Sequence, residues 1–481
     1  MPGHRGGYDK MTVSDAPARP ARRRTGLAGN RDFLLLWIGS GFSALGARAT
    51  SIGYTLLVFW STGSATAASL VTFAALLPNL VAQLPAGALV DRWNRRTTML
   101  ACTVVRVAGV GSVAVVVLLD AVWLPHLMFV AFVEATLGIC YTLAERAAVG
   151  SVVPRDQLGA ATAANESRAN AASILGQPAG TVLYSVARFA PFLFATVAHL
   201  ISLVTLLFMR RDLRAPRAAG AAPGRLLAEI KEGFDFVWGQ LYLRRALCLF
   251  AASNILFQIL GLGLVVLVKE RGGEPATVGL LLVVNSVFGM LGAMTSNVYL
   301  RRWGIRRMMI GINVGWAVLM PLLVVAPGLI VVSAILALIN YGAGIGNVAG
   351  MLYLLKTAPD ELRGRAGSIF TLLASGANAA GALLAGFLLD HLGIEVALVI
   401  VGATMVVIAI FAVLAFGTRA AAEAERAEAA AEAAAEAERL PTPTPADPHP
   451  HPRAPAPQRP RPRPRAPRAP RPRAPRPAPP R

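Results

Sequence analysis

The chain has 481 residues, of which 55% are hydrophobic and only 15% charged, and its mean hydropathy is +0.55. Charged residues make up about a quarter of an ordinary soluble domain, so this composition excludes that class. The formal net charge is +20, but the basic residues follow the pattern of membrane topology rather than that of a nucleic-acid surface. Nucleic acid is therefore not an expected partner.

Twelve stretches are long and apolar enough, or nearly so, to cross a bilayer as helices, which takes about 20 apolar residues. The strands of a membrane barrel would instead alternate in hydrophobicity. No secretory signal is expected, because the first apolar run is long and lacks a small-residue cleavage site. The sequence predicts an all-α integral membrane protein with twelve transmembrane helices in two six-helix halves. The predicted spans are 33–59, 68–90, 98–119, 124–143, 161–187, 191–209, 246–268, 278–300, 308–325, 329–355, 366–389 and 396–416.

The loops predict how these helices are oriented, since Lys and Arg near helix ends are retained on the cytoplasmic side. Most loop Lys and Arg lie in the even-numbered joints, such as those between the second and third and between the sixth and seventh helices. The odd-numbered joints hold only Arg188, Lys269 and Arg271. Together with the basic N-terminal segment, this bias predicts a multi-pass protein of a bacterial plasma membrane with both termini in the cytoplasm.

A polar connector divides the chain. It mixes apolar and charged residues at helical intervals, which predicts an amphipathic helix at the cytoplasmic interface. The tail is rich first in Ala and Glu and then in Pro and Arg, which is typical of a disordered chain; it either touches anionic lipid or is a passive appendage. The predicted parts are a cytoplasmic segment 1–32, a first half 33–209, the connector 210–245, a second half 246–417 and the cytoplasmic tail 418–481.

A short internal repeat supports the two halves. Aligning Trp93 with Trp303 pairs "DRWNRR" with "RRWGIRR", and Arg96 then meets Arg306. Both segments fall between the second and third helix of their half, where a duplication would place them. Because the match is short, the duplication is a hypothesis at this point.

The first of these segments, "GALVDRWNRR", resembles the loop motif G-x-L-a-D-R-x-G-R-R/K of the major facilitator superfamily, with Asn94 where glycine is usual. The segments "NRDFLLLWIGS", "VVPRDQLGAATAANESRANAASILGQPAG" and "APDELRGRAGSIF" are similar to those of the branch that includes the bacterial siderophore and macrolide exporters. The resemblance covers roughly residues 30–417. It implies two six-helix halves around a central substrate site that opens alternately to either side of the membrane.

At the cytoplasmic end of the second helix, Asp91 can pair with Arg95 across the turn, and an anion there also favours the positive N-terminus of a neighbouring helix. The resemblance implies that this neighbour is the start of the eleventh helix, near residues 364–367, so that the contact latches the cytoplasmic gate. The alternative is that the arginines only anchor the topology, which suits Arg92 and Arg96 at least as well. The predicted gate motif comprises Gly87, Asp91, Arg92, Arg95 and Arg96.

Three positions depart from the family pattern. The first helix of that branch commonly carries "LGD", whereas this chain has "LGA" followed by Arg48, and Ala47 cannot couple to protons as an aspartate would. The antiporter signature G-P-x-x-G-G of the fifth helix is reduced to "GQPAGT" at residues 176–181. Arg301 stands where Asp91 would align in the second half, so the latch is predicted to be one-sided. These departures leave a non-transporting membrane scaffold open.

Charged side chains inside a bilayer cost several kcal/mol unless they face a cavity or a partner. Glu134 lies midway along the fourth helix, where a buried carboxylate can take up and release a proton. It serves either to bind a proton or a substrate cation, or to form a purely structural pair with an arginine. Arg48 and Arg106 are the candidate partners, and either could instead attract an anionic substrate group. His199 is expected to be hydrogen-bonded structure rather than a proton carrier.

Two further sets of polar residues are candidates for function. A cytoplasmic charge network is predicted at the end of the fourth helix and the start of the fifth, with solvated interface anchors as the alternative. Amides in the second half either line a cavity or make interhelical hydrogen bonds of about 1 kcal/mol each. The network candidates are Glu145, Arg146, Asn165, Glu166 and Arg168, and the amide candidates are Asn254, Gln258, Asn285, Asn340, Asn347 and Asn378.

No nucleotide motif, metal-ligand spacing or cofactor site stands out, so we expect neither an enzyme nor a bound cofactor or metal. Cys102, Cys140 and Cys248 are expected to be small core residues. We predict a secondary transporter, functional as a monomer in the lipid bilayer, that exports a hydrophobic or amphipathic small molecule such as a drug or secondary metabolite by alternating access. Inward proton flow is the expected drive. An importer of the same fold and a membrane scaffold are the alternatives.

Overall fold

The computed structural model describes residues 26–209, 223–357 and 362–417, which form helices and no strand. The all-α prediction is confirmed for this part of the chain. The predictions on the N-terminal segment before residue 26, the first part of the connector and the tail lie outside the described residues. The helices are α1 (Arg31–Thr62), α2 (Ala65–Val81), α3 (Gln83–Arg92), α4 (Arg95–Leu118), α5 (Leu124–Val152), α6 (Leu158–Val186), α7 (Ala190–Phe208), α8 (Pro223–Gly239), α9 (Leu241–Glu270), α10 (Pro275–Leu322), α11 (Leu329–Thr357) and α12 (Arg363–Phe416).

Two of these helices are broken by a glycine. Gly304 inside α10 has φ 71° and ψ 166°, and Gly393 inside α12 has φ 77° and ψ 168°. Side chains strongly disfavour this backbone region, so the chain can turn there only at glycine. Each break falls between two predicted spans, which explains why one continuous element covers both.

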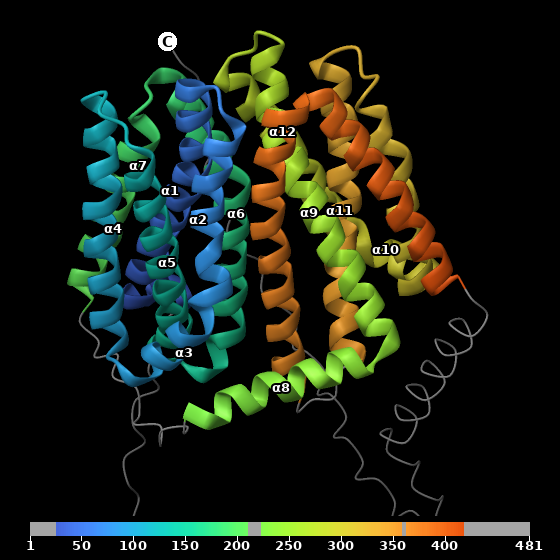
Figure 1. The fold of residues 1–481 in the computed structure, drawn as a ribbon. Coiled ribbons are helices and arrows are strands. Elements are labelled where there is room, and N and C mark those ends of the chain that lie inside the picture. The colour runs from blue at the N-terminus through green and yellow to red at the C-terminus, as the bar shows by residue number, and fades with distance from the viewer. Residues whose placement is uncertain (1–25, 210–222, 358–361, 418–481) are drawn as a thin grey trace, which may run out of the picture. The chain divides into compact units, whose positions relative to one another are not determined.

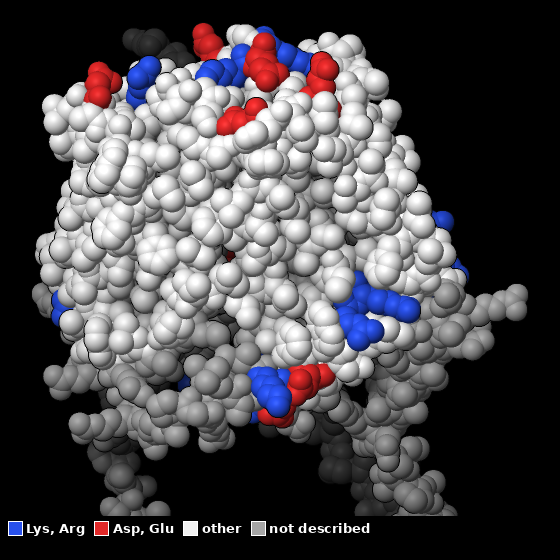
Figure 2. Space-filling model, viewed as in Figure 1, with Lys and Arg blue, Asp and Glu red and all other residues white. Residues whose placement is uncertain are grey.

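Eight helices within the described ranges are long and apolar enough to cross a membrane: α1, α4, α5, α7, α9, α10, α11 and α12. Since α10 and α12 each cover two predicted spans, the remaining predicted spans are 68–90 and 161–187. They coincide with α2 and α3 and with α6, which are shorter or more polar. The prediction of a multi-helix membrane protein is confirmed, and the count of twelve crossings stays a prediction. Figure 2 shows a broad, mostly uncharged band between charged groups near the upper and lower ends.

The helices gather in two groups, α1 to α7 (blue to green) and α9 to α12 (lime to orange), while α8 crosses their lower end (Figure 1). Helix α8 lies inside the predicted connector, and α9 begins at Leu241, also inside it. That α8 lies amphipathically at the cytoplasmic interface stays a prediction. Glu232 of α8 forms an ion pair of 2.5 Å with Arg365 at the start of α12. Because Gly233 packs closely against the backbone of Arg365, α8 is attached to the second group.

Arg96 and Arg306, which the internal repeat aligns, make the same kind of contact in the two halves. Arg96 donates hydrogen bonds to the carbonyls of Leu206 (3.2 Å) and Leu207 (2.9 Å), at the end of α7. Arg306 donates one of 2.7 Å to the carbonyl of Phe416, at the end of α12. Each arginine satisfies carbonyls that a helix end leaves without a partner. The shared contact supports the duplication.

We call the end of the bundle near the odd-numbered loops the outer end and the opposite end the inner end, following the predicted topology. The two halves share one hydrophobic core towards the outer end, where Leu57 and Leu127 belong to the same buried cluster as Val268 and Leu281. Towards the inner end, a separate buried cluster around Met99 contains residues of the first half alone. Cys102 and Cys140 lie in this inner cluster, as predicted, whereas Cys248 is exposed.

Two helix pairs carry the main contacts between the halves, α2 with α12 and α6 with α10. The Thr66 hydroxyl of α2 donates to the Gly386 carbonyl of α12 at 3.2 Å. Gly279 of α10 packs against Thr181 of α6. All four residues lie near the outer ends of their helices. The structure therefore joins the halves most firmly at the outer end.

Candidate functional site

Three ionisable side chains meet inside the first half. Glu134, in the middle of α5, is buried, with 6% of the residue exposed. Arg106 of α4 places Nη2 at 3.9 Å from Glu134 Oε1. His199 of α7 places Nε2 at 3.5 Å from the same oxygen. Of the two predicted arginine partners, the structure therefore brings Arg106 to Glu134.

Hydroxyl groups of α1 complete the surroundings of the carboxylate. Thr50 Oγ1 donates to Glu134 Oε1 at 3.1 Å, and the Tyr54 hydroxyl donates to Oε2 at 3.4 Å. Both residues are buried. A buried carboxylate needs such donors, because water no longer solvates it. Glu134 is thus held between α1, α4 and α7.

Ser43 of α1 connects the other two groups. Its Oγ accepts a hydrogen bond of 2.8 Å from Arg106 Nη1 and lies 3.2 Å from His199 Nδ1. Once Ser43 accepts from Arg106, its own proton is free to point at His199. Ser43 and His199 are both satisfied when a neutral His199 accepts at Nδ1 and donates from Nε2 to Glu134, whereas the buried Arg106 Nε has no hydrogen-bond partner among the described residues. The hydrogen bond from His199 to Glu134 therefore depends on whether Glu134 is ionised.

The charge of this site changes with a single proton. Ionised Glu134 and Arg106 compensate each other, and two charges about 4 Å apart attract by about 4 kcal/mol at an effective dielectric constant of 20. A proton on Glu134 leaves the Arg106 charge uncompensated. Breaking a buried pair in this way costs about 3–5 kcal/mol. Proton binding here would penalise this arrangement of the helices.

A second polar layer lies nearer the inner end. The Tyr141 hydroxyl of α5 is 2.9 Å from Ser40 Oγ of α1 and 3.1 Å from Ser202 Oγ of α7. Glu145, one turn further along α5, forms an ion pair of 2.7 Å with Arg168 of α6. All five side chains are largely shielded from solvent. This layer repeats the pattern of the first, with a carboxylate, an arginine and hydroxyls.

The predicted charge network is therefore present in part. Glu145 and Arg168 form its ion pair, and Arg168 also donates to the Trp37 carbonyl of α1 at 3.3 Å. Arg146 and Glu166 are exposed instead, as the alternative of solvated anchors has it. Asn165 is half-buried at the same end of α6.

Arg48 takes a different position from the one that would neutralise Glu134. It lies on α1 against Gly176 of α6, so close that a side chain at residue 176 would clash with it. Gly180, one turn on, lies against the backbone of Ala49. The remnant "GQPAGT" of the antiporter signature thus brings α6 tightly against α1. The sequence departure leaves this close packing intact.

The structure describes only part of the predicted gate motif. The side chains of Asp91 and Arg92 lie outside the described residues, and the predicted pair of Asp91 with Arg95 stays a prediction. Arg95 donates to the Ala147 carbonyl at 2.9 Å and to Ser151 Oγ at 2.8 Å, both at the end of α5. Arg95 and Arg96 thus tie helix ends together within the first half. A Cβ added at Gly87 would meet none of the described atoms within 4 Å.

The amides of the second half divide into two groups. Asn254 donates to the Phe250 carbonyl at 2.8 Å and Asn340 to the Leu336 carbonyl at 2.9 Å, each within its own helix. For these two, the expected interhelical bond is not the one that forms. Asn285 is buried, while Gln258, Asn347 and Asn378 are partly or fully exposed. A role in lining a substrate cavity stays a prediction for this set.

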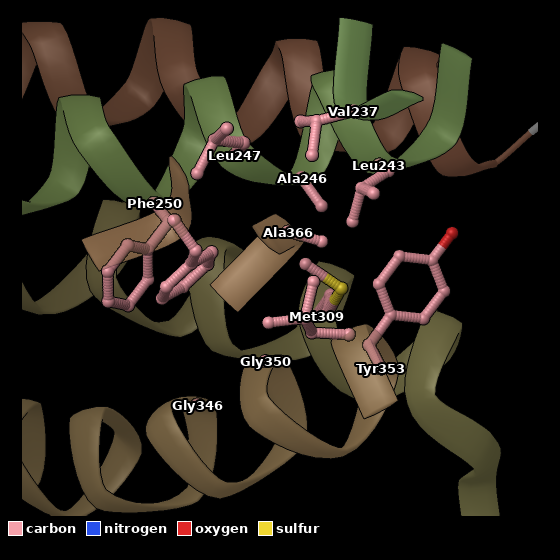
Figure 3. Close-up of a pocket in the computed structure, with 12 residues that line it drawn as sticks. Val237, Leu243, Ala246, Leu247, Phe250, Met309, Gly346, Gly350, Tyr353 and Ala366 are labelled. Atoms are coloured by element: carbon pink, nitrogen blue, oxygen red, sulfur yellow. The ribbon is translucent and has the colours of Figure 1, made fainter. Parts of the chain in front are cut away.

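An apolar pocket lies where α8 meets the inner ends of α9, α11 and α12 (Figure 3). Its lining includes Val237, Leu247 and Phe250, and its volume is about 40 Å³. Sites for drug-sized ligands are about 300–1,000 Å³, so this pocket is a packing seam beneath α8. Within the described residues, no group of His, Cys, Asp and Glu could hold a metal ion.

Comparison with known proteins assigns this architecture. The model of the transmembrane secretion effector family, part of the major facilitator superfamily, matches residues 27–441. The chain belongs to this family. The membership agrees with the resemblance of "GALVDRWNRR" to the superfamily loop motif and identifies a membrane transporter fold. The closer resemblance to siderophore and macrolide exporters stays a prediction.

Two multidrug efflux pumps are similar in sequence to this chain. The multidrug efflux pump Tap of Mycolicibacterium fortuitum is 27% identical over 383 residues, which cover 77% of this chain and 93% of the pump. The pump Tap of Mycobacterium tuberculosis H37Rv is 27% identical over 372 residues, covering 76% and 88%.

Solved structures share the fold at lower identity. The nucleoside transporter NupG aligns with a TM-score of 0.63 and 14% identity over 81% of this chain and 99% of its own. A bacterial homologue of the lysosomal transporter Spinster, described as inward-facing and unoccupied, aligns with a TM-score of 0.59 and 13% identity over 80% and 95%. At these identities the structures establish the fold alone.

Sequence reasoning missed the hydroxyl groups around Glu134, although this family member carries a signal for them. On α1, Ser43 and Thr50 are seven residues apart, which places them on one helix face. On α5, Glu134 and Tyr141 have the same spacing. Polar residues repeated at intervals of three, four and seven in apolar helices would have marked these facing surfaces.

Proposed function

We propose that the chain is a proton-coupled exporter of hydrophobic or amphipathic small molecules of the drug type, working as a monomer in a bacterial plasma membrane with both termini in the cytoplasm. Its relatives named as multidrug efflux pumps support drugs as the substrate class. The buried pair of Glu134 and Arg106 carries the proposal of proton coupling. A carboxylate at this depth is expected to have a function, because burying it is costly.

The position of Glu134 offers a replacement for the aspartate that the exporters resembling this chain carry in the middle of their first helix, where this chain has Ala47. Ala47 lies four residues after Ser43 and three before Thr50, so it shares their face of α1. On that face, Thr50 donates to Glu134 and Ser43 accepts from Arg106. An aspartate at residue 47, as in the exporters that this chain resembles, would project towards the same site. In our proposal, Glu134 supplies from α5 the carboxylate that α1 lacks at residue 47.

The contacts between the halves support a state that is open towards the cytoplasm. The halves share a core and their closest contacts at the outer end, whereas the inner cluster belongs to the first half alone. In this state, the substrate would enter between the inner ends of the halves while Glu134 is ionised.

Protonation of Glu134 then changes the relative free energies of the two states. Protonation of Glu134 leaves Arg106 uncompensated in its buried position and so favours a different packing of α1, α4, α5 and α7. A penalty of about 3–5 kcal/mol is close to the ~5.5 kcal/mol that moves an equilibrium from 1:99 to 99:1. Proton uptake from outside and release inside, alternating with substrate, would then drive export.

Everted membrane vesicles with an acidic interior test this proposal. Adding lipophilic cations, macrolides or iron chelates should release protons from the wild-type vesicles as the compounds are pumped in. Glu134→Gln, expressed and folded to the same level, should reduce this release at least tenfold. Glu395→Gln is the matched control, because Glu395 is exposed and lies at the outer end, away from the buried site.

The outcomes separate the alternatives. Proton release that persists in Glu134→Gln would still indicate export but would refute the role of this carboxylate. Compounds that leave the vesicles when the gradient is imposed would indicate an importer. No flux of any compound in either direction would contradict transport and favour a membrane scaffold.

A further inference from the structure

We propose that Tyr141, with Ser40 and Ser202, forms the path by which a proton passes between Glu134 and the inner end of the first half, where Glu145 exchanges it with the cytoplasm. This inference rests on the proposed function, since it requires that Glu134 binds and releases a proton. It assigns a role in the transport reaction to three hydroxyl groups and a second carboxylate.

The first observation is that two polar layers are stacked along the same helices. Glu134 and Tyr141 lie two turns apart on α5, and Glu145 follows one turn later. On α1 the hydroxyls of Ser43 and Ser40 are one turn apart, and on α7 His199 and Ser202 are one turn apart. Each of these three helices therefore contributes at least one group to the upper layer and at least one to the lower layer. One turn is about 5 Å, so the two layers are about 5 Å apart along α1 and α7 and about 10 Å apart along α5.

The second observation is that the lower layer is continuous. Tyr141 is within hydrogen-bond distance of both Ser40 (2.9 Å) and Ser202 (3.1 Å). Only 3% of Tyr141, 3% of Ser40 and none of Ser202 is exposed. A structural hydroxyl in an apolar helix is usually satisfied by its own backbone, as Thr103 is by the Met99 carbonyl. These three hydroxyls face one another across three helices instead.

The third observation is that the chain of polar groups ends at a second buried carboxylate. Glu145 is 5% exposed, and Ser40 also lies beside it. Along α5 it is 11 residues from Glu134, about 16 Å nearer the inner end. Arg168 pairs with Glu145 at 2.7 Å. The path therefore starts and ends at groups that can hold one proton each.

Hydroxyls suit this role because each can accept a proton on its oxygen while it donates its own. When Glu134 releases a proton to His199, the imidazole returns one from its other nitrogen towards Ser43. Ser43 gives its own proton to a water molecule between the two layers, and this water gives one to Ser202. Ser202, Tyr141 and Ser40 pass a proton on in the same way, and Glu145 gains the proton that Glu134 lost. No hydroxyl or imidazole changes its charge overall, and Arg106 stays charged throughout.

The charged groups facing this path come from four helices. Arg106 of α4 stands near both Glu134 and Tyr141. Glu145 belongs to α5 itself, together with the exposed Arg146, and Arg168 comes from α6. His199 of α7 completes the set. Any pH dependence of the path reflects these groups together.

Time-resolved infrared spectroscopy after a proton jump tests the inference without a substrate. The full chain is placed in lipid nanodiscs, a caged acid releases protons, and the carboxyl band that Glu134→Gln removes reports proton uptake by Glu134. Tyr141→Phe and Ser202→Ala should slow the rise of this band at least tenfold while the pH of half-protonation stays unchanged. Tyr184→Phe, which alters a buried tyrosine outside the path, should match the wild type.

The rate and the midpoint together decide between a path and a structural role. Wild-type rates in Tyr141→Phe and Ser202→Ala would overturn the inference and place proton entry between the two halves. A slower rise with a shifted midpoint would show that the hydroxyls only shape the site, which also overturns it. Ser202→Ala removes a single oxygen and keeps the test valid if Tyr141→Phe does not fold. If Glu134→Gln removes no titrating band, the proposed function itself fails.

Discussion

Asp390 of α12 binds the first backbone amide of α2. The Asp390 Oδ1 atom accepts a hydrogen bond of 2.6 Å from the backbone N–H of Ala65. Its Oδ2 accepts from the Thr66 N–H at 2.8 Å and from Ser64 Oγ at 2.7 Å. The carboxylate of one half thereby caps a helix of the other, where the helix dipole also favours an anion. This contact fastens the outer end.

We predict that Asp390→Asn loosens the outer end, because an amide keeps the shape of the side chain but loses the charge. The loss of about 1 kcal/mol should shift the balance of states several-fold towards an open outer end. Spin labels at Ala121 and Val396, with Cys248 replaced by Ser, would report the opening as an increase in the distance between the two labels. The same shift in Glu395→Gln would contradict a specific role of the Asp390 cap.

Lys269 provides an independent tie between the halves. Its Nζ donates to the Phe59 carbonyl at 2.8 Å and stands 4.5 Å from the centre of the Phe59 ring. Lys269→Met keeps the apolar stem but removes the donor and the cation–π contact. We expect a shift in the same direction as in Asp390→Asn, with the double variant showing the sum of both effects. A double variant no different from the single ones would indicate one shared contact.

Gly386 lies at a close approach of α2 and α12, where a Cβ would clash with the Ser69 side chain and come within 2.8 Å of the Thr66 backbone. Gly386→Ala should therefore separate the outer ends and lower transport at least tenfold. Gly261→Ala makes the same chemical change on α9, where the added carbon meets no described atom within 4 Å. It should be neutral or slightly stabilising. Equal effects of the two substitutions would contradict the close approach.

The pair of Arg106 and Glu134 should be coupled in stability. Arg106→Gln leaves a buried carboxylate without its cation and should destabilise the protein by about 3 kcal/mol or more. Arg106→Gln combined with Glu134→Gln should recover most of this loss, because two amides carry no charge. Thermal unfolding in detergent measures both. If the two single effects simply add in the double variant, Arg106 and Glu134 do not interact in the folded protein.

Sequence reasoning identified the helical membrane fold, and it singled out the carboxylate at the centre of the candidate site, whose role stays a prediction. An ionised group in an apolar helix is so costly that Glu134 and Arg106 were conspicuous. Helix geometry could also have decided between Arg48 and Arg106 as the partner of Glu134. Arg48 is two residues from Thr50, which turns it to the opposite side of α1 from the donor to Glu134.

Contacts between distant segments were beyond that reasoning. The cap of α2 by Asp390 joins residues 325 positions apart, and its formation depends on how the two halves pack. No local pattern around Ala65 or Asp390 signals it. The repeated positions Arg96 and Arg306 were aligned from the sequence, but the helix ends that they bind emerged only from the fold.

Transport by the purified chain in liposomes tests most directly the claim that Glu134 couples export to protons. A lipophilic cation inside the liposomes is measured against time while a proton gradient of either direction is imposed. We predict that wild-type protein moves the cation against its own gradient, opposite to the protons, and that Glu134→Gln retains only movement down the gradient of the cation. Accumulation by Glu134→Gln at the wild-type level, or accumulation that ignores the proton gradient, would contradict the account.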